Sequence, residues 1–410
     1  MQSCDVLIIG GGPAGLAAAT SLYGAGVKNI LLLEREKQLG GILRQCIHDG
    51  FGLMRFGASL SGPEYAWRFI EELERMKVPY RVNTSVTALS SDRIATVVSP
   101  DGVEQIKAKA IVLAMGCRER TRGALAIPGE RPSGVFTAGV AQNYTNLYNL
   151  SVGKEAVILG SGDIGLIMAR RLTLEGTHVK GVYEILPYPS GLNRNIRQCL
   201  DDYNIPLYLS HTVTEIHGGS RLTGVTVSRV DGNKTPISGT ETEISCDTLI
   251  LSVGLIPENE LSLEAGVKLD QKTKGALVDN KYQTSVPGIF AAGNVLHVHD
   301  LVDYVSLEAE RLAASVKKFL IDGASAGTEI SVNAGNGVNY VLPQKTRAGD
   351  DFVLSLRVGE PIRQQTLLVK QGNHVILEKK LPRALPAEML QLDIDGNMIT
   401  ENEAIEVLVK

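Results

Sequence analysis

The sequence has few of the features that mark disulfide-rich, metal-cluster or membrane-spanning proteins. Its five cysteines, at positions 4, 46, 117, 199 and 246, are odd in number and form no C-x-x-C pair. This spacing argues against a disulfide framework, a zinc site and a self-contained iron–sulfur site. No apolar run approaches the ~20 residues that a membrane-spanning helix needs. The chain also enters an apolar segment almost at once, which leaves no room for a signal peptide, so we expect a cytoplasmic protein with reduced thiols.

An excess of charge of one sign is also absent. Over 410 residues, 41 Lys and Arg stand against 45 Asp and Glu, a formal net charge of −4 at pH 7. The sequence therefore predicts no basic surface for nucleic acid. Hydrophobic residues make up 44% and charged residues 21%, as in ordinary globular chains, and the length allows two or three domains.

Glycine, by contrast, is frequent, and near the N-terminus its spacing is informative. The apolar run Val6 to Ile9 predicts a buried parallel strand, followed by Gly10, Gly12 and Gly15 in the pattern G-x-G-x-x-G. The first glycine permits a tight turn, the second lets a pyrophosphate approach the backbone, and the third lets the next helix pack closely. A second apolar strand ends at Glu34, nineteen residues after the last glycine, where a carboxylate would bind ribose hydroxyls. The segment predicts a dinucleotide site with the phosphates at a helix N-terminus.

The same pattern occurs a second time. Residues 155–159 predict a strand, Gly160, Gly162 and Gly165 repeat the glycine spacing, and Glu184 again lies nineteen residues after the last glycine. Internal duplication of this kind is stronger support for nucleotide binding than either motif alone.

Each repeat contains a predicted β-meander and closes with an apolar strand. The expected segments are 82–89, 94–99, 105–110 and 110–114 in the first repeat, and 207–215, 222–230, 242–245 and 248–253 in the second. The interval from first to closing glycine is 106 residues in the first repeat and 94 in the second.

Other segments complete the expected organisation. Gly40-Gly41 suggests a loop close to a ligand, and residues 61–64 form a capping box that opens a helix. Residues 303–320 read as a helix, and residues 331–410 as a small β-domain, a sandwich by pattern, with a hairpin turn at 371–373.

The ordered motifs resemble the two-dinucleotide-binding-domain flavoproteins, the pyridine nucleotide–disulfide oxidoreductase superfamily. The segments that carry the resemblance are residues 10–15, 113–116, 160–165, 251–254 and 289–294. It implies an α/β fold with two Rossmann-like three-layer domains, the second inserted in the first, plus the C-terminal β-domain. The implied boundaries are 1–120 with 257–325 for an FAD-binding domain, 121–256 for an NAD(H)-binding domain and 331–410 for the β-domain.

The resemblance also assigns cofactor-binding residues. Those expected to bind FAD are Gly10, Gly12, Pro13, Ala14, Gly15, Glu34, Arg35, Gly41, Met115, Gly116, Gly293, Asn294, Tyr304 and Val305. Those expected to bind NAD(H) are Gly160, Gly162, Asp163, Ile164, Gly165, Glu184 and Gly254. The helix beginning near Tyr304 would aim its N-terminal amides at the flavin and stabilise negative charge on the reduced ring.

A closer resemblance concerns residues 45–52 and 294–300. They look like a bacterial subgroup similar to a subunit of heteromeric NADH oxidases, often associated with a glycerol-3-phosphate dehydrogenase-like flavoprotein and a small cysteine-rich protein. More distant relatives are subunits of opine oxidase and hydrogen cyanide synthase. The implied partners are a nicotinamide dinucleotide, a flavoprotein subunit and a cysteine-rich subunit, without nucleic acid or membrane span.

Two departures from the superfamily matter. Asn294 stands where an aspartate is usual, and an amide can still accept a hydrogen bond from a ribityl hydroxyl. The disulfide reductases carry two cysteines soon after the Gly-Gly pair, whereas here Cys46 alone comes soon after Gly40-Gly41, so the dithiol relay cannot form. Cys46 and His48 are candidate catalytic residues, although a packed thiol is the commoner reading.

The other histidines leave alternatives open. His48, His297 and His299 could cluster near the flavin or a partner surface. His297 and His299 with Asp300 could hold a metal, but packing or hydrogen bonding is commoner, and no metal is expected.

The leading functional prediction is hydride transfer between NADH and flavin, with electrons passed to a partner subunit, a dye or quinone, or oxygen. One alternative is a flavoprotein subunit that itself oxidises an amino acid, an opine or a glycerol-3-phosphate-type substrate. Another is a flavin-bearing scaffold for a catalytic partner.

Overall fold

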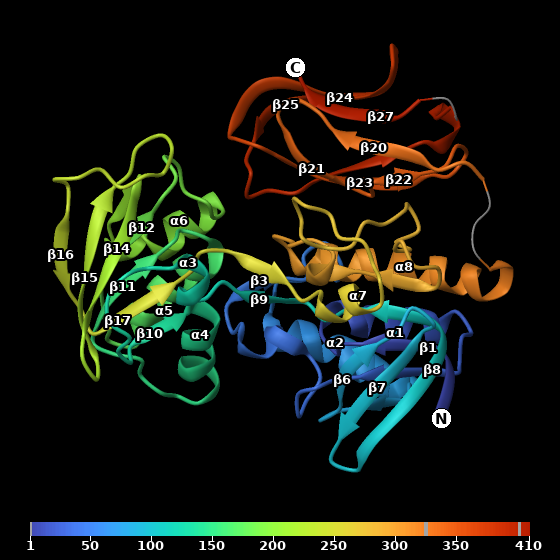
Figure 1. Ribbon diagram of the computed structural model, residues 1–410, viewed down its shortest axis with the longest axis horizontal. Helices are drawn as coiled ribbons and strands as arrows, with labels where there is room; N and C mark the ends of the chain where they lie inside the picture. Colours follow the sequence, from blue (N-terminus) through green and yellow to red (C-terminus); the bar gives the residue numbers. More distant parts are fainter. Residues whose placement is uncertain (1, 324–326, 401–402) are drawn as a thin grey trace. The chain divides into compact units, whose positions relative to one another are not determined.

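The computed structural model describes residues 2–323, 327–400 and 403–410. The chain divides into two compact units, one made of residues 1–117 and 257–410 and the other of residues 118–256 (Figure 1). The expected boundary at residue 325 lies outside the described residues. No helix among the described residues is long and apolar enough to cross a membrane.

The first unit is built on a seven-stranded mixed sheet. Its parallel strands are β1 (Gln2–Ile9), β2 (Ile30–Leu33), β5 (Tyr80–Arg81), β8 (Gly102–Leu113) and β19 (Ile289–Ala291). The order is β5-β2-β1-β8-β7-β6, with β19 also on β8. Val6 to Ile9 are buried on both faces, as the uninterrupted apolar run predicts for a central parallel strand.

Strand β8 corrects one expectation. The separate strands expected at 105–110 and 110–114 are one strand, which pairs antiparallel with β7 (Ile94–Ser99) over residues 102–107 and parallel with β1 over residues 106–113. The chain runs straight through this stretch without a turn, so the meander and the parallel sheet share one strand. The remaining meander strand is β6 (Ser85–Leu89), which pairs with β7.

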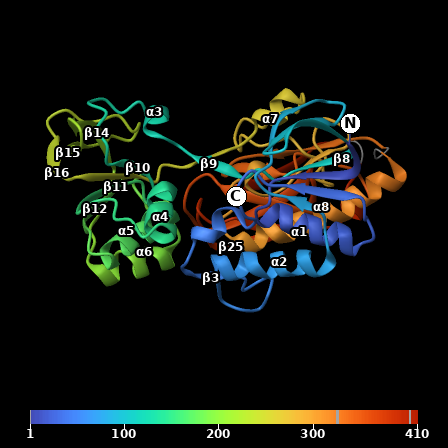
Figure 2. The same cartoon turned by 90° about the horizontal axis from the view of Figure 1, so that it is seen from below.

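Three long helices pack with this sheet (Figure 2): α1 (Pro13–Gly24), α2 (Gly62–Met76) and α8 (Val302–Asp322). Small residues fill the buried face of α1, which lets it contact both α2 and α8. The predicted capping box is confirmed, because Glu64 accepts hydrogen bonds from the Ser61 backbone N–H (2.8 Å) and hydroxyl (2.7 Å). Shorter elements are η1 (Gly41–Gln45), β3 (Asp49–Phe51), β4 (Leu60–Ser61), α7 (Glu260–Glu264) and η3 (Gly293–Val295).

The second unit has three layers. Its parallel sheet has the order β10-β17-β11-β12-β13. The strands are β10 (Val135–Thr137), β11 (Glu155–Leu159), β12 (His178–Glu184), β13 (Leu207–Leu209) and β17 (Thr248–Leu251). Along β11, residues 156 and 158 pack in the core with the helices, while residues 157 and 159 pack in the core with the antiparallel sheet. This alternation is the period of two expected for a strand covered on both faces.

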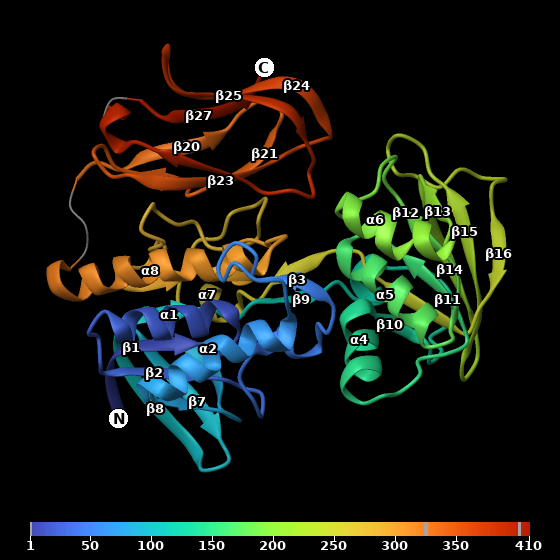
Figure 3. The ribbon, with the colours of Figure 1, turned by 180° about the vertical axis from the view of Figure 1, so that it is seen from behind.

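The outer layers of this unit are seen in Figure 3. The helices are α4 (Ala138–Leu147), α5 (Asp163–Leu174) and α6 (Asn193–Cys199), and the opposite sheet is β14 (His211–Gly218), β15 (Leu222–Arg229) and β16 (Thr242–Ser245). The strand expected at 207–215 is two strands, since Ser210 adopts a left-handed conformation (φ 55°) that separates β13 from β14. Short α3 (Arg122–Leu125) and η2 (Asp201–Tyr203) also belong here, and β9 (Cys117–Glu119) and β18 (Leu255–Pro257) pair where the chain enters and leaves.

The C-terminal residues form a β-sandwich within the first unit. One sheet has the order β22-β20-β27-β24-β25 and the other β21-β23-β26, and their facing apolar residues form a separate core. The strands are β20 (Ile330–Ala334), β21 (Val338–Leu342), β22 (Lys345–Thr346), β23 (Phe352–Val358), β24 (Ile362–Gln371), β25 (His374–Ala384), β26 (Leu390–Ile394) and β27 (Ile405–Val409), with η4 (Gly396–Met398). The predicted hairpin turn is present, with Gly372 at φ 52°.

Candidate functional site

Two glycines of the first loop are required by the chain itself. Gly10 has a φ of +109°, and a Cβ there would lie 2.3 Å from the Ala114 carbonyl oxygen. A Cβ on Gly15 would lie 1.8 Å from the Gly10 carbonyl oxygen. Any larger residue at either position would push the strand, turn and helix α1 apart.

Gly12 differs from its two neighbours in the motif. Its φ of −80° and ψ of −172° suit any residue, and a Cβ would meet only the Gly41 Cα, at 3.9 Å. Neither backbone strain nor protein packing therefore demands glycine here. The open space over Gly12, at the N-terminus of α1, fits a ligand group that approaches the backbone closely, as a pyrophosphate does.

Glu34 lies beside this loop and is buried. Its Oε2 accepts a hydrogen bond from the Gly11 N–H (2.7 Å) and its Oε1 from the Glu36 N–H (2.8 Å). Since an ionised carboxylate offers about four acceptor positions, acceptor capacity remains for ribose hydroxyls.

Several of the other residues expected at the flavin come together around the loop. A Cβ on Gly293 would lie 2.8 Å from the Ala14 Cβ and 3.2 Å from the Val305 Cγ1, so α1, η3 and α8 meet at this glycine. A Cβ on Gly41 would lie 3.0 Å from the Gly12 Cα.

The remaining residues expected at the flavin make fewer close contacts with the loop. Pro13 opens α1, Met115 packs against the core and Gly116 (φ +74°) has open space around its Cβ position. Tyr304 is half-buried on the first turn of α8, whereas Arg35 is exposed.

Asp303 at the start of α8 was not identified from the sequence. Its buried carboxylate accepts hydrogen bonds from the backbone N–H groups of Gly52 (3.0 Å) and Arg55 (2.8 Å). It therefore fixes the segment after η1 to the N-terminus of α8. The available signal was an acidic residue in the first turn of a predicted helix.

The second loop has the same pattern of required and unrequired glycines as the first. Gly160 has a φ of +96°, and a Cβ there would lie 2.0 Å from the Ser252 carbonyl oxygen. This close approach matches that of a Cβ on Gly10 to the Ala114 carbonyl oxygen. A Cβ on Gly165 would lie 2.7 Å from the Ser252 Cβ. Gly162 again adopts an ordinary extended conformation, with its nearest neighbour, Ser252 Oγ, at 3.5 Å.

The Glu184 carboxylate accepts more hydrogen bonds from the protein than the Glu34 carboxylate does. Its Oε2 accepts from the Ser161 N–H (2.9 Å), the Ser161 hydroxyl (2.6 Å) and the Ser190 hydroxyl (2.8 Å), and its Oε1 from the Leu186 N–H (3.0 Å). Acceptor capacity toward a ligand therefore lies on Oε1.

The other residues expected at this loop shape its surroundings. Asp163, in the first turn of α5, accepts from the Leu192 N–H (2.8 Å) and the Asn195 amide (2.7 Å), which fixes the segment before α6. Ile164, in the first turn of α5, is partly buried against the core of the second unit, and Gly254 (φ +103°) has open space around its Cβ position.

Cys46 follows η1 and is half-buried, and its thiol donates to the Ile42 carbonyl oxygen at 3.4 Å. Burial raises the pKa of this thiol to about 12, so it is protonated at neutral pH. A protonated thiol is a poor nucleophile. His48, the other catalytic candidate, packs its ring against Phe51 at 4.9 Å between centroids.

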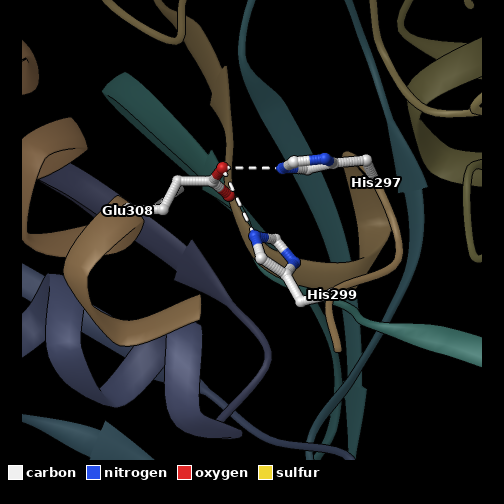
Figure 4. A group of neighbouring side chains, drawn as sticks. All are labelled: His297, His299 and Glu308. Carbon is white, nitrogen blue, oxygen red and sulfur yellow. Dashed lines mark hydrogen bonds and ion pairs between the residues drawn. The ribbon is translucent and has the colours of Figure 1, made fainter. Parts of the chain in front are cut away.

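His297 and His299 do cluster, but with a different acid from the one expected. Their ring centroids are 4.2 Å apart, and both face Glu308 on α8 (Figure 4). Asp300 instead accepts from Arg357 Nη2 (3.4 Å) and the Met389 N–H (3.2 Å) of the β-sandwich. The sequence signal for Glu308 was a charged residue on the apolar face of a helix.

Comparison with known proteins supports the two-loop architecture. The family model described as pyridine nucleotide-disulphide oxidoreductase matches residues 4–313. The chain is similar to the small chain of NADPH glutamate synthase from Mycobacterium tuberculosis, at 27% identity over 78% of this chain and 67% of that one. It is also similar to the hydrogen cyanide synthase subunit HcnB of Pseudomonas protegens, at 27% identity over 72% of this chain and 66% of that one. The chain thus spans about two thirds of each relative.

The fold is likewise similar to a solved structure. The crystal structure of T. acidophilum thioredoxin reductase matches with a TM-score of 0.64 and 26% identity, over 78% of this chain and all of that one. This confirms the expected α/β class. The chain belongs to the pyridine nucleotide-disulphide oxidoreductase family, whose members bind FAD and use NAD(P)H, and it is an FAD-dependent NAD(P)H oxidoreductase.

Proposed function

We propose that this chain takes a hydride from NADH onto FAD and passes the electrons to a partner subunit, a dye or quinone, or oxygen. The observation that carries the proposal is the duplicated loop. In both units the middle glycine, Gly12 or Gly162, is the one that the fold itself does not need. Two such loops in one chain support two nucleotides, FAD at the first and NADH at the second. Bound flavin would supply the hydride-accepting chemistry, and the protein supplies binding, orientation and electrostatics.

The choice of NADH over NADPH rests on Glu184. Its buried carboxylate ends β12, where the ribose of a nicotinamide nucleotide binds in such folds. A negative charge there accepts from a 2′-hydroxyl and repels a 2′-phosphate. Arg194 and Arg197 on α6 are exposed, and they are the nearby cations in sequence that would soften this preference.

Anaerobic mixing with each nucleotide tests the proposal. We expect NADH to bleach the flavin, with kcat/KM at least about tenfold above that for NADPH, or ~1.4 kcal/mol in transition-state binding. Glu184→Gln removes the negative charge but keeps a hydrogen-bond acceptor, so it should lower the ratio of kcat/KM for NADH to that for NADPH. Equal values for the two nucleotides in the wild type would refute the NADH assignment. Bleaching by an amino acid or opine instead of NADH would favour the substrate-oxidising alternative.

Cys46→Ser should leave this reduction intact. The thiol is protonated, and no other cysteine lies near it in sequence, so the flavin must take the hydride directly. We expect a stopped-flow rate within about threefold of wild type, or ~0.7 kcal/mol, and no inflection from this thiol between about pH 6 and 9. A loss of several orders of magnitude would show instead that the thiol takes part in the chemistry.

We further propose that the chain works as a subunit. Two of its relatives are named as a small chain and a subunit, and the sequence resembles a subgroup paired with a glycerol-3-phosphate dehydrogenase-like flavoprotein and a cysteine-rich protein. The expected signature is fast reduction by NADH but slow turnover with oxygen alone. Efficient oxidation of a small organic substrate by the isolated chain would contradict a subunit role.

A further inference from the structure

His297, His299 and Glu308 form a buried group that the proposed hydride transfer does not use; we call it the histidine–glutamate cluster (Figure 4). The two histidines follow η3, and Glu308 lies on α8. All three side chains are only 1% exposed. Both imidazole Nε2 atoms face the same carboxylate oxygen, Glu308 Oε2, at 2.9 Å from His297 and 3.5 Å from His299.

The neighbouring Asn294 determines which ring nitrogen of a neutral His299 carries the proton. The backbone N–H of His299 donates to Asn294 Oδ1 at 3.0 Å, which fixes the amide with its oxygen toward His299. The ring Nδ1 lies 3.2 Å from the same oxygen and must therefore be the protonated nitrogen. Nε2 of a neutral His299 is then a bare lone pair, buried and without a hydrogen-bond partner, and it faces a carboxylate oxygen.

Two electron-rich atoms that face each other in a buried site need a positive charge between them. We propose that the histidine–glutamate cluster binds one divalent first-row transition-metal ion, zinc or iron(II), through His297 Nε2, His299 Nε2 and Glu308 Oε2. The competing occupant is a second proton on His299, which would make the cluster an ordinary buried ion pair.

The geometry suits an ion. A tetrahedral ion with bonds of ~2.0–2.1 Å separates its donor atoms by about 3.4 Å. The two nitrogen-to-carboxylate distances, 2.9 Å and 3.5 Å, lie on either side of that value, and all three donor atoms lie within 4.8 Å of one another. Two imidazoles and one carboxylate form a ligand set that zinc and non-haem iron(II) both use.

The outer atoms of the ligands are held as they are in metal sites. His297 Nδ1 lies 3.4 Å from the Tyr340 hydroxyl, His299 Nδ1 bonds to Asn294, and Glu308 Oε1 accepts from the Gly293 N–H at 2.7 Å. Such second contacts fix the tautomer and orientation of metal-bound histidines. Each ligand thus keeps one atom anchored and turns the other toward the common centre.

A bound ion would fasten the segment after η3 to helix α8 and, through Tyr340, to the β-sandwich. Tyr340 also accepts from Arg357 Nε at 3.2 Å, and Arg357 Nη2 donates to the Val298 carbonyl oxygen at 3.1 Å. The role inferred is structural, and it is independent of the proposed hydride transfer.

Metal content of the untagged full-length protein tests the proposal. Cells are grown with added zinc and iron(II), because a site this buried fills during folding, and the purified chain is analysed by mass spectrometry of its metals. We expect about one ion per chain in the wild type and about a tenth of that or less in His299→Gln and Glu308→Gln. His374→Gln, on the exposed end of strand β25, is the matched control and should keep its ion.

X-ray absorption at the metal edge gives a second measurement on the wild type alone, which decides the matter if the cluster variants fail to fold. A first shell of nitrogen and oxygen atoms at ~2.0–2.1 Å from the metal, with the outer-shell scattering of imidazole rings, would support the site. Sulfur at ~2.3 Å would place the ion on a cysteine and overturn the proposal. It would also be overturned by a metal-free wild type, or by folded cluster variants that keep the wild-type ion content. None of these readouts depends on NADH or on flavin reduction.

Discussion

Gly12→Val is expected to fold and to lose its FAD. Because a Cβ at this position meets no protein atom closer than 3.9 Å, and φ and ψ are ordinary for any residue, the substitution should leave the fold nearly intact. The added methyl groups would occupy the space over the N-terminus of α1, where the pyrophosphate is proposed to bind. We expect flavin occupancy after desalting to fall by at least about tenfold, which corresponds to ~1.4 kcal/mol or more of binding free energy.

Two further variants separate this effect from damage to the fold. Gly219→Val changes an exposed glycine with open space around it and should keep its flavin. Gly15→Ala places a Cβ 1.8 Å from the Gly10 carbonyl oxygen and should destabilise the first unit, seen as a lower Tm. Full flavin occupancy in a folded Gly12→Val protein would mean that FAD binds elsewhere.

Gly162→Val should give the opposite phenotype, with flavin retained and reduction by NADH lost. The nearest atom to a Cβ there is Ser252 Oγ, at an ordinary 3.5 Å, so the second unit should fold. The side chain would block the nucleotide at the N-terminus of α5. We expect the rate of flavin bleaching at fixed NADH to fall by about a hundredfold or more, or ~2.7 kcal/mol.

The variant carries its own controls. Dithionite should still bleach its flavin, because that reductant needs no nucleotide site. The Gly12→Val protein should conversely still bind NADH, as measured by nucleotide fluorescence. If Gly162→Val is reduced by NADH as fast as wild type, the second loop is not the NADH site.

The sequence was sufficient for the duplicated framework, because its signals are local. A strand buried on both faces needs an apolar run, a tight turn needs Gly10 or Gly160, and close helix packing needs Gly15 or Gly165. The capping box at Ser61 and the turn at Gly372 are local in the same way. Each of these features leaves a signal within a few positions in the sequence, so the pattern alone predicts it, although the atoms that exclude a side chain at Gly10 and Gly160 belong to the distant residues Ala114 and Ser252.

The tertiary structure decided whatever depends on pairing between distant segments. The sequence pattern did not show that residues 102–113 form one strand shared by two neighbours, or that Ser210 divides a strand between two sheets. Backbone hydrogen bonds to distant strands determine both.

Side-chain partners were likewise decided by the fold. Asp300 is adjacent to the histidines in sequence, yet it pairs with Arg357 of the β-sandwich. The carboxylate beside the two imidazoles is instead that of Glu308, on helix α8. Burial of Cys46, which keeps its thiol protonated, also comes from packing around the segment. The sequence therefore determined which chemical groups are present and where the loops bend. Only the three-dimensional packing determined which charges share a buried space, since that depends on desolvation and on contacts between residues far apart in the chain.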